Sequence, residues 1–331
     1  MYYAGIDLHR QDIVVAIENQ TGPVGKPQRF LCMDVDGIHS FFDKLRPFRA
    51  VIEATSSYRW LYDLLAPLGE VVLAHPYRLR AIVAGRAKTD KLDSALLAKL
   101  LRADLIPRAY VPPEPYAQLR DLTRARSRIV RHQVQTKNEL HALLARHNVH
   151  PPFKTTFGKR WIKWVAQADL GMAGTILRDE MLRRIAHYQQ EIQRLDVVLE
   201  EIAPAFPQIE ALLSIRGVGR YTALLLVAEI GEPWRFANGK QVGAYAGLTA
   251  RVNQSGGHCY HGHITRQGSG WIRWALVQVA MKVTPGDAKL QAMYTRIRKR
   301  SSAHIARVAV ARKLASICWL RLMRWHFAQA A

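Results

Sequence analysis

The alternation of apolar and polar positions changes character along the chain. In its first part, short runs rich in Val, Ile and Tyr alternate with segments whose apolar positions recur every three or four residues. This pattern predicts strands at 2–7, 12–18, 27–33, 50–54 and 71–74, and helices at 37–45, 57–68 and 90–101. The order β-β-β-α-β-α-β-α predicts an α/β domain with a mixed sheet and helices on its faces.

A proline-rich segment at 106–113 ends this part, because its prolines forbid a helix or a central strand. Two long helical patterns follow, at 114–148 and 173–203. They predict either an antiparallel helical hairpin or a dimerising coiled coil, and their irregular heptads do not distinguish the two. We therefore expect three domains, at 1–112, 113–203 and 204–331.

The last third combines helices with glycine-rich turns. Residues 212–223 predict two helices joined by a tight turn at Gly217 and Gly219. This resembles the helix-hairpin-helix motif, in which glycine amides meet a DNA phosphate, and an ordinary turn between helices is the alternative. Residues 251–257 are polar and contain two glycines, so they predict a loop, and further helices are predicted at 271–281 and 305–325.

The charge of the chain indicates a polyanionic partner. Of its 331 residues, 48 are Lys or Arg and 26 are Asp or Glu, a net charge of +22. Residues 204–331 contain 18 basic and 4 acidic residues, net +14, whereas residues 1–112 contain 15 and 12, net +3. Such an excess favours nucleic acid binding by the last third. The 3 cysteines are widely separated and no apolar run is long enough to span a membrane, so we expect a cytoplasmic protein without disulfides or a signal peptide.

Four acidic residues in the first domain are candidates for a metal site. Asp90 and Asp93 are three residues apart at the start of a predicted helix and therefore share a face. Paired carboxylates suit divalent metal ions that act on a phosphodiester, although helix capping is the simpler interpretation of these two alone. Asp7 on the first strand and Glu53 at the end of the fourth add two more carboxylates and favour the metal site.

Several basic and glycine positions are candidates for nucleic acid contacts. Four arginines fall on one face of the helix predicted at 114–148, which is either a solvated face or a phosphate-contacting stripe. The full set of expected contacts is Arg120, Arg124, Arg128, Arg131, Gly217, Gly219, Arg220, Arg266 and Arg273.

Ser255 is a candidate nucleophile because it precedes a flexible glycine pair, although such a serine is more often a turn residue. Nearby, Cys259, His261 and His263 alternate and would share one face of a strand. A structural zinc site needs four ligands that converge from separated segments, so this short cluster does not favour zinc.

Seven short motifs occur together in one order. They are residues 5–7 (GID), 52–55 (IEAT), 88–93 (KTDKLD), 215–219 (IRGVG), 245–249 (YAGLT), 255–257 (SGG) and 262–268 (GHITRQG). The acids of the first three resemble those of the ribonuclease H-like (RuvC-like) fold of Holliday-junction resolvases. The whole series resembles the DEDD transposases of bacterial insertion sequences, recombinases guided by a structured bridge or seeker RNA.

The resemblance implies a role for each candidate residue. Asp7, Glu53, Asp90 and Asp93 would hold Mg²⁺ or Mn²⁺, and Ser255 would attack a DNA phosphate to form a covalent phosphoserine. Tyr260 is the nearest rival nucleophile. A composite active site across a dimer would follow if one protomer cannot bring the acids and Ser255 together. The alternatives are a junction-resolving nuclease with water as nucleophile, and a non-enzymatic nucleic-acid-binding protein.

The resemblance also implies an architecture and partners. It predicts a RuvC-like domain, a helical coiled-coil middle and a mostly helical C-terminal transposase domain with the helix-hairpin-helix. Expected partners are donor and target DNA, a structured non-coding guide RNA, and further copies of the chain in a dimer or dimer of dimers. The bacterial nucleoid is the expected location.

Overall fold

The computed structural model describes residues 1–83, 90–255 and 258–330, and it describes no side chain at 83–92, 252–261 or 330. The chain divides into two compact units, Met1–Val111 and Pro112–Ala331. Each is described by itself below.

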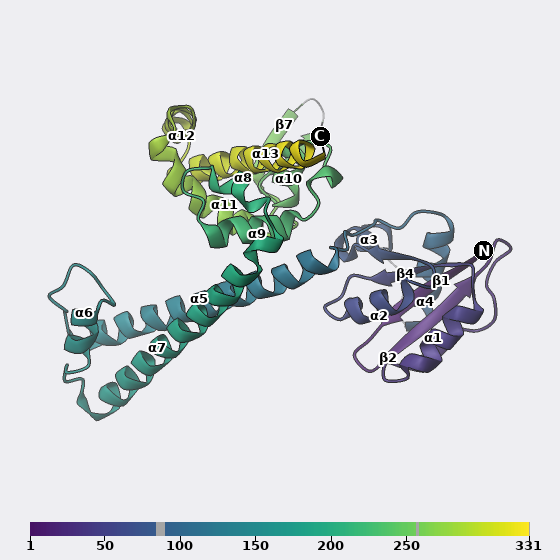
Figure 1. The fold of residues 1–331 in the computed structure, drawn as a ribbon, viewed down its shortest axis with the longest axis horizontal. Coiled ribbons are helices and arrows are strands. Elements are labelled where there is room, and N and C mark those ends of the chain that lie inside the picture. Colours follow the sequence, from purple (N-terminus) through teal and green to yellow (C-terminus); the bar gives the residue numbers. More distant parts are fainter. Residues whose placement is uncertain (84–89, 256–257, 331) are drawn as a thin grey trace. The chain divides into compact units, whose positions relative to one another are not determined.

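The first unit is a mixed sheet covered by helices (Figure 1). Its strands are β1 (Tyr2–Leu8), β2 (Asp12–Glu18), β3 (Gln28–Leu31), β4 (Phe48–Glu53) and β5 (Glu70–Ala74). Its helices are α1 (Val35–Lys44), α2 (Tyr58–Leu65), α3 (Pro76–Val83) and α4 (Asp90–Arg102). The strand order is β3-β2-β1-β4-β5. The first three strands are antiparallel neighbours, and β4 and β5 run parallel to β1.

The two faces of this sheet bury different side chains because neighbouring residues of a strand point to opposite sides. Ile6 and Ile52 pack with Phe42 of α1 and Leu61 of α2. On the other face, the cluster that contains Val51 also contains Leu97 and Leu101 of α4. The mixed sheet with helices on its faces, predicted from the alternation, is confirmed.

Helix α3 is an element that the apolar pattern did not predict. The pattern predicted no helix between the strand at 71–74 and the helix at 90–101, whereas Pro76 is the first residue of α3. Proline is well tolerated at the first helical position, since the amide hydrogen that it lacks has no partner within the helix there. The one residue therefore ends β5 and begins the next helix.

The second unit begins with two long helices that run antiparallel, α5 (Glu114–Arg146) and α7 (Gly171–Ile202), joined through α6 (Lys159–Val165). Arg126 of α5 pairs with Asp196 of α7 at 2.5 Å, and Gln133 donates to Gln189 at 3.2 Å, so higher numbers on one helix meet lower numbers on the other. Of the two arrangements predicted for these helices, the structure has the antiparallel hairpin.

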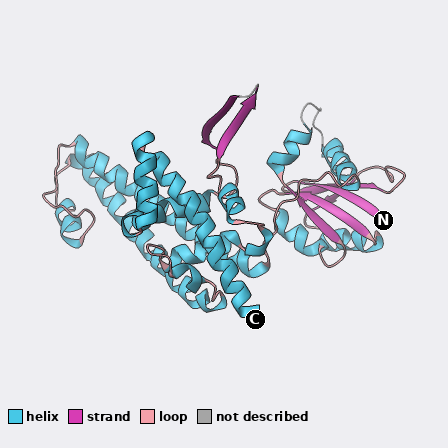
Figure 2. Ribbon diagram, turned by 90° about the horizontal axis from the view of Figure 1, so that it is seen from above, coloured by secondary structure: helices cyan, strands magenta, loops and turns pink. Residues whose placement is uncertain are grey.

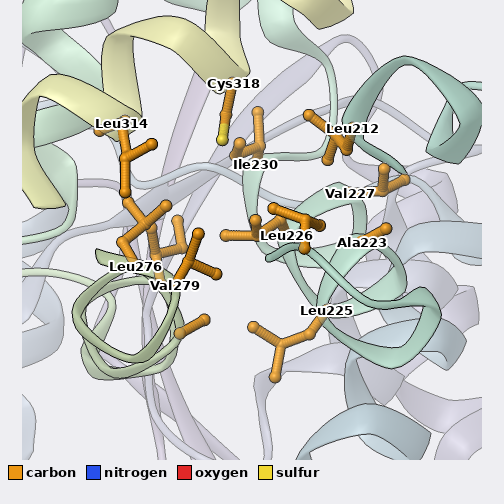
Figure 3. Packing of buried hydrophobic residues seen from close by; sticks show 14 of the residues in the cluster. Leu212, Ala223, Leu225, Leu226, Val227, Ile230, Leu276, Val279, Leu314 and Cys318 are labelled. Carbon is orange, nitrogen blue, oxygen red and sulfur yellow. The ribbon is translucent and has the colours of Figure 1, made fainter. Parts of the chain in front are cut away.

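The remaining elements form a mostly helical body. They are α8 (Ile209–Leu213), α9 (Arg220–Ile230), α10 (Gly239–Tyr245), β6 (Ala250–Ser255), β7 (His258–Ile264), α11 (Gly270–Val283), α12 (Ala288–Arg300) and α13 (Ala303–Ala330). Helix α9 is its centre, with every residue from Ala223 to Ile230 buried. Figure 3 shows Leu226 and Ile230 of α9 facing Leu276 of α11 and Cys318 of α13.

One expectation for this body is wrong. Residues 251–257 were predicted to be a polar loop, but Ala250–Ser255 form strand β6, which pairs antiparallel with β7. Val252 faces His261 and Ser255 faces His258 in this register. Polar side chains do not exclude a strand when the partner strand supplies the backbone hydrogen bonds. Figure 2 shows the two strands extending away from the helices.

No helix in the part of the chain that the structure describes is long and apolar enough to cross a membrane.

Candidate functional site

Two of the four candidate acids lie side by side at one edge of the sheet. Strands β1 and β4 are parallel, and the last pair in their register is Ile6 with Ile52. Asp7 and Glu53 are each the next residue, so both lie at the carboxyl ends of adjacent parallel strands. The carboxyl edge of such strands is where ligands bind in open α/β sheets.

Both carboxylates lie on the face that α4 covers. Tyr3 and Val51 belong to the apolar cluster under α4. Asp7 is four residues after Tyr3, and Glu53 is two after Val51, so alternation places all four side chains on that face. The Asp7 side chain is 18% exposed, so it is largely buried but still reachable from solvent.

Helix α4 brings Asp93 towards the same edge. A Cβ atom on Gly5 would lie 2.0 Å from the Ser94 carbonyl oxygen, so α4 passes directly over the middle of β1. The other end of α4 is held by Arg102, whose Nε lies 2.9 Å from the Glu18 carboxylate, beside the start of β1. Helix α4 is therefore antiparallel to β1, and its first turn, with Asp93, lies towards Asp7. Asp90 begins this turn, but its side chain lies outside the described residues.

His9 is a residue at this edge that the sequence reasoning missed. Its Nε2 lies 3.1 Å from the Asp7 carboxylate. The signal was available in the sequence, because Asp7 and His9 are two residues apart at a strand end and alternation places them on one side. The imidazole ring therefore lies directly beside the Asp7 carboxylate.

The chemistry of this edge suits a hard divalent cation, because carboxylate oxygens are the donors that Mg²⁺ and Mn²⁺ prefer. Among the residues whose side chains are described, no three His, Cys, Asp or Glu groups converge closely enough to hold a metal ion. Asp7, Glu53 and Asp93 are among the residues so described, so these three carboxylates do not form a metal site by themselves, and the side chain of Asp90 lies outside that description.

Two of the sequence motifs meet at the base of the β6–β7 hairpin. The Thr265 amide donates to the Thr249 carbonyl at 2.9 Å, and the Ser269 amide donates to the Tyr245 carbonyl at 2.8 Å. Arg273 donates from Nη1 to the Ala246 carbonyl at 2.8 Å. The segments 245–249 and 262–268 are thus one structural unit, which holds the hairpin whose first strand ends at Ser255.

Around Ser255 only the backbone is described. Ser255 is the last residue of β6, and its register partner is His258. The side chains of Ser255, Cys259, Tyr260 and His261 lie outside the described residues, so their expected roles remain predictions. The strand expected for the alternating Cys and His residues is present as β7.

Two of the four arginines predicted to form a stripe on α5 bind other parts of the protein, and the other two are exposed. Arg120 is 8% exposed, and it donates to the carbonyl oxygens of Ala228 and Glu229, each at 2.7 Å. Arg124 forms two hydrogen bonds with the Glu229 carboxylate, at 2.6 and 3.0 Å. These two guanidinium groups bind the end of α9, which leaves the exposed Arg128 and Arg131 for the predicted phosphate contacts.

Glu229 is a buried acid that sequence reasoning did not single out. Its side chain is fully buried, and it also accepts a hydrogen bond from the Ser269 hydroxyl at 2.8 Å. Burial alone would lower the pKa of Arg124, but the Glu229 carboxylate outweighs it and the pKa of Arg124 is raised. The pair joins α5, α9 and, through Ser269, the start of α11.

The other predicted contacts lie in the same body. Gly217 has a φ of +85°, in the left-handed region, and forms the turn between α8 and α9, while Gly219 precedes the first residue of α9. Arg220 forms an ion pair with Glu200 of α7. Arg266 has a φ of +54°, and burial together with this neighbouring cation lowers the pKa of Arg273.

Comparison with known proteins decides the family. A model described as the transposase IS116/IS110/IS902 family matches residues 209–309, and a DEDD transposase model of the IS110 type matches residues 4–149. The chain belongs to the IS110 family of DEDD transposases. This membership implies a DNA-processing enzyme, and the resemblance drawn from the seven motifs is confirmed.

The individual relatives have low sequence identity to this chain, but they align with most of its length. A putative transposase of Sinorhizobium fredii is 27% identical over 66% of this chain, and the chain spans about half, 54%, of that relative. A probable family 20 transposase of Pseudomonas aeruginosa is 26% identical over 87% of each chain. The transposase for insertion sequence element IS1328 of Yersinia enterocolitica is 22% identical over 96% of this chain and 95% of its own.

Proposed function

We propose that this IS110-family transposase is an RNA-guided DNA recombinase that cuts and rejoins strands through a phosphoserine at Ser255. The observation that supports this most is the position of Asp7 and Glu53 at the carboxyl ends of adjacent parallel strands, with the first turn of α4 directed to the same edge. The mixed five-stranded sheet with helices on both faces supports a ribonuclease H-like, RuvC-like domain.

In this proposal the four carboxylates and Ser255 have separate tasks. Asp7, Glu53, Asp90 and Asp93 hold Mg²⁺ or Mn²⁺, which when bound polarises a phosphodiester and stabilises developing negative charge. The Ser255 oxygen attacks phosphorus, a P–O bond to deoxyribose breaks, and the serine proton passes through solvent to the departing oxygen. Reversal of the step by another strand's hydroxyl rejoins DNA without an external energy source.

The partners follow from the same proposal. Donor and target DNA are the substrates, and a structured bridge RNA selects them by base pairing, so that sequence choice is delegated to RNA. The net +14 of residues 204–331 supports a large nucleic acid surface there. The acids belong to one compact unit and Ser255 to the other. A composite site assembled in a dimer or dimer of dimers is what the family resemblance implies.

The nucleophile is tested by trapping it. The protein, with the RNA that copurifies with it, is mixed with a nicked suicide DNA, denatured and analysed by mass spectrometry. A nucleotide adduct on the peptide that contains Ser255 is expected, and it should be absent from Ser255→Ala. An adduct on Tyr260 would move the nucleophile, and cleavage without any adduct would favour the water-using nuclease.

The metal site and the RNA are tested separately. Asp93→Asn should abolish cleavage while DNA binding persists, because binding comes mainly from the basic residues of the other unit. Unchanged cleavage would support helix capping as the role of Asp93. Protein stripped of RNA should fail to cut a defined DNA site, and equal cutting would refute the role of RNA.

A further inference from the structure

A cavity of about 450 Å³ lies between α10, α12 and α13, and none of the candidate site residues lines it. Lys240 lines it from α10, Met293 from α12, and Arg312, Lys313 and Ser316 from α13. Thr249, the residue before β6, completes its polar lining. Three cations and two hydroxyl groups therefore surround one space.

Close packing of two helices builds the wall of this cavity. A Cβ atom on Gly239 would lie 2.6 Å from the Ser316 Cα, and one on Gly243 would lie 3.2 Å from the Arg312 Cγ. These glycines are one turn apart on α10, as Ser316 and Arg312 are on α13. The glycine face lets α10 approach α13 closely and places Gly243 against the stem of Arg312.

The charge of this cavity has little compensation. Residues 233–331 contain one acidic residue, Asp287. The Asp287 carboxylate accepts the Leu290 amide at 2.9 Å and so caps the start of α12. Positive charge with hydroxyl donors, and no acid among the described residues that line the cavity, is complementary to a phosphate group, to which arginine donates in a bidentate manner and lysine as a point charge.

The lining of this cavity allows a bound group to continue outside it as part of a longer chain. Lys240, Arg312 and Lys313 are all exposed, so the cavity opens onto the surface of the most basic part of the protein. A phosphate with its sugar can enter while its neighbours continue outside. The apolar side chain of Met293 suits the sugar ring.

The position of the cavity selects which strand it holds. Thr249 lies six residues before Ser255, which is about 20 Å along an extended strand. Successive base pairs of DNA are about 3.4 Å apart, so the cavity lies within about six nucleotides of the residue that would be attacked. We propose that this cavity binds a backbone phosphate of the DNA strand presented to Ser255. The choice of DNA rests on the proposed function of Ser255, whereas phosphate binding does not.

The charge of the cavity is tested with two matched variants on the same helix. Arg312→Gln with Lys313→Gln removes two cavity cations, and Arg321→Gln with Arg324→Gln removes two exposed cations outside it. Binding to a 40-base-pair DNA duplex is measured as a function of salt. Each lost phosphate contact lowers the slope of log affinity against log salt by about 0.9, so the cavity variant, which loses the one phosphate held there, should lose about 0.9 and the control much less.

Equal slopes in the two variants would overturn phosphate binding at the cavity. The conservative pair Arg312→Lys with Lys313→Arg should retain the slope, which separates loss of charge from loss of fold.

The strand is identified by replacing Met293 with a photoreactive benzoylphenylalanine in protein that holds its copurified RNA and a nicked DNA. Adducts on DNA within about six nucleotides of the nick are expected. Adducts on RNA alone, or none, would overturn the assignment. Neither measurement needs cleavage, so a failed Ser255 adduct leaves phosphate binding standing and removes only the nucleophile.

Discussion

The contact between Arg124 and Glu229 is predicted to be a major stabilising feature of the second unit. Replacing Glu229 by Gln keeps the shape of the side chain but removes the charge that neutralises Arg124. Removing one partner of a buried ion pair costs about 3–5 kcal/mol. The Arg124 side chain is 32% exposed and Glu229 is 0% exposed, so water partly compensates the remaining cation and we expect the low end, about 3 kcal/mol.

The effect is measurable in two ways. A loss of about 3 kcal/mol lowers the melting temperature of a unit of this size by roughly 6–12 °C. Hydrogen exchange of the buried amides of α9 should accelerate roughly 100-fold, since about 1.4 kcal/mol corresponds to a factor of ten. Peptide-level mass spectrometry assigns this change to α9 and the facing part of α5.

Two further variants make this prediction refutable. Glu191→Gln removes a carboxylate from an ion pair with Arg194 whose side chains are 33% and 78% exposed, and it should cost less than about 0.5 kcal/mol. The double variant Arg124→Met with Glu229→Leu should recover at least half of the loss, because no buried charge remains unpaired. If Glu229→Gln and Glu191→Gln have equal effects, the buried pair does not stabilise the junction of α5 and α9.

Two other predictions concern the first unit and the core of the second. Gly5→Ala should destabilise the first unit by about 1–3 kcal/mol in urea unfolding, because the added Cβ would lie 2.0 Å from the Ser94 carbonyl oxygen. In the control Gly158→Ala, the added Cβ meets only a methyl group at 3.9 Å. Equal urea midpoints for the two variants would contradict the close approach of α4 to β1. Complete burial raises the pKa of the Cys318 thiol from 9.0 to about 12, so the native protein should resist alkylation at pH 8.5. The free energy of unfolding should fall as pH rises from about 9 towards 12, because the thiol ionises more readily in the unfolded chain. Rapid labelling of Cys318 in the folded state would refute the prediction.

Periodicity predicted the sheet and most helices because burial on one face repeats at intervals of two or between three and four residues. It failed at Pro76, which begins helix α3, and at β6, whose residues 253–255 are polar in succession and show no apolar alternation. A strand of polar residues is stabilised by backbone hydrogen bonds to its partner strand. The apolar pattern does not reveal that partner, which here is β7.

The candidate site was predictable only in part. The placement of Asp7 on the first strand and Glu53 at the end of the fourth favoured one shared site, but the pattern did not predict that these two strands are parallel neighbours, which puts both acids at one edge. The arginine stripe was ambiguous, since the partner of Arg124 is Glu229, 105 residues further along the chain. No local pattern distinguishes an arginine that binds a buried carboxylate from one that faces solvent. His9 was overlooked although its spacing from Asp7 was visible.

The two ends of the α5–α7 hairpin have separate apolar cores. At the far end, Trp161 and Val165 of α6 pack with Leu140 and Leu143 of α5, whereas Leu119 belongs to the core around α9. Leu119 and Leu140 are 21 residues apart, about 30 Å along a helix. Mutations at sites so far apart change stability additively. Within this family, the far end of the hairpin can therefore diverge in sequence and length without compensating changes at the junction with α9.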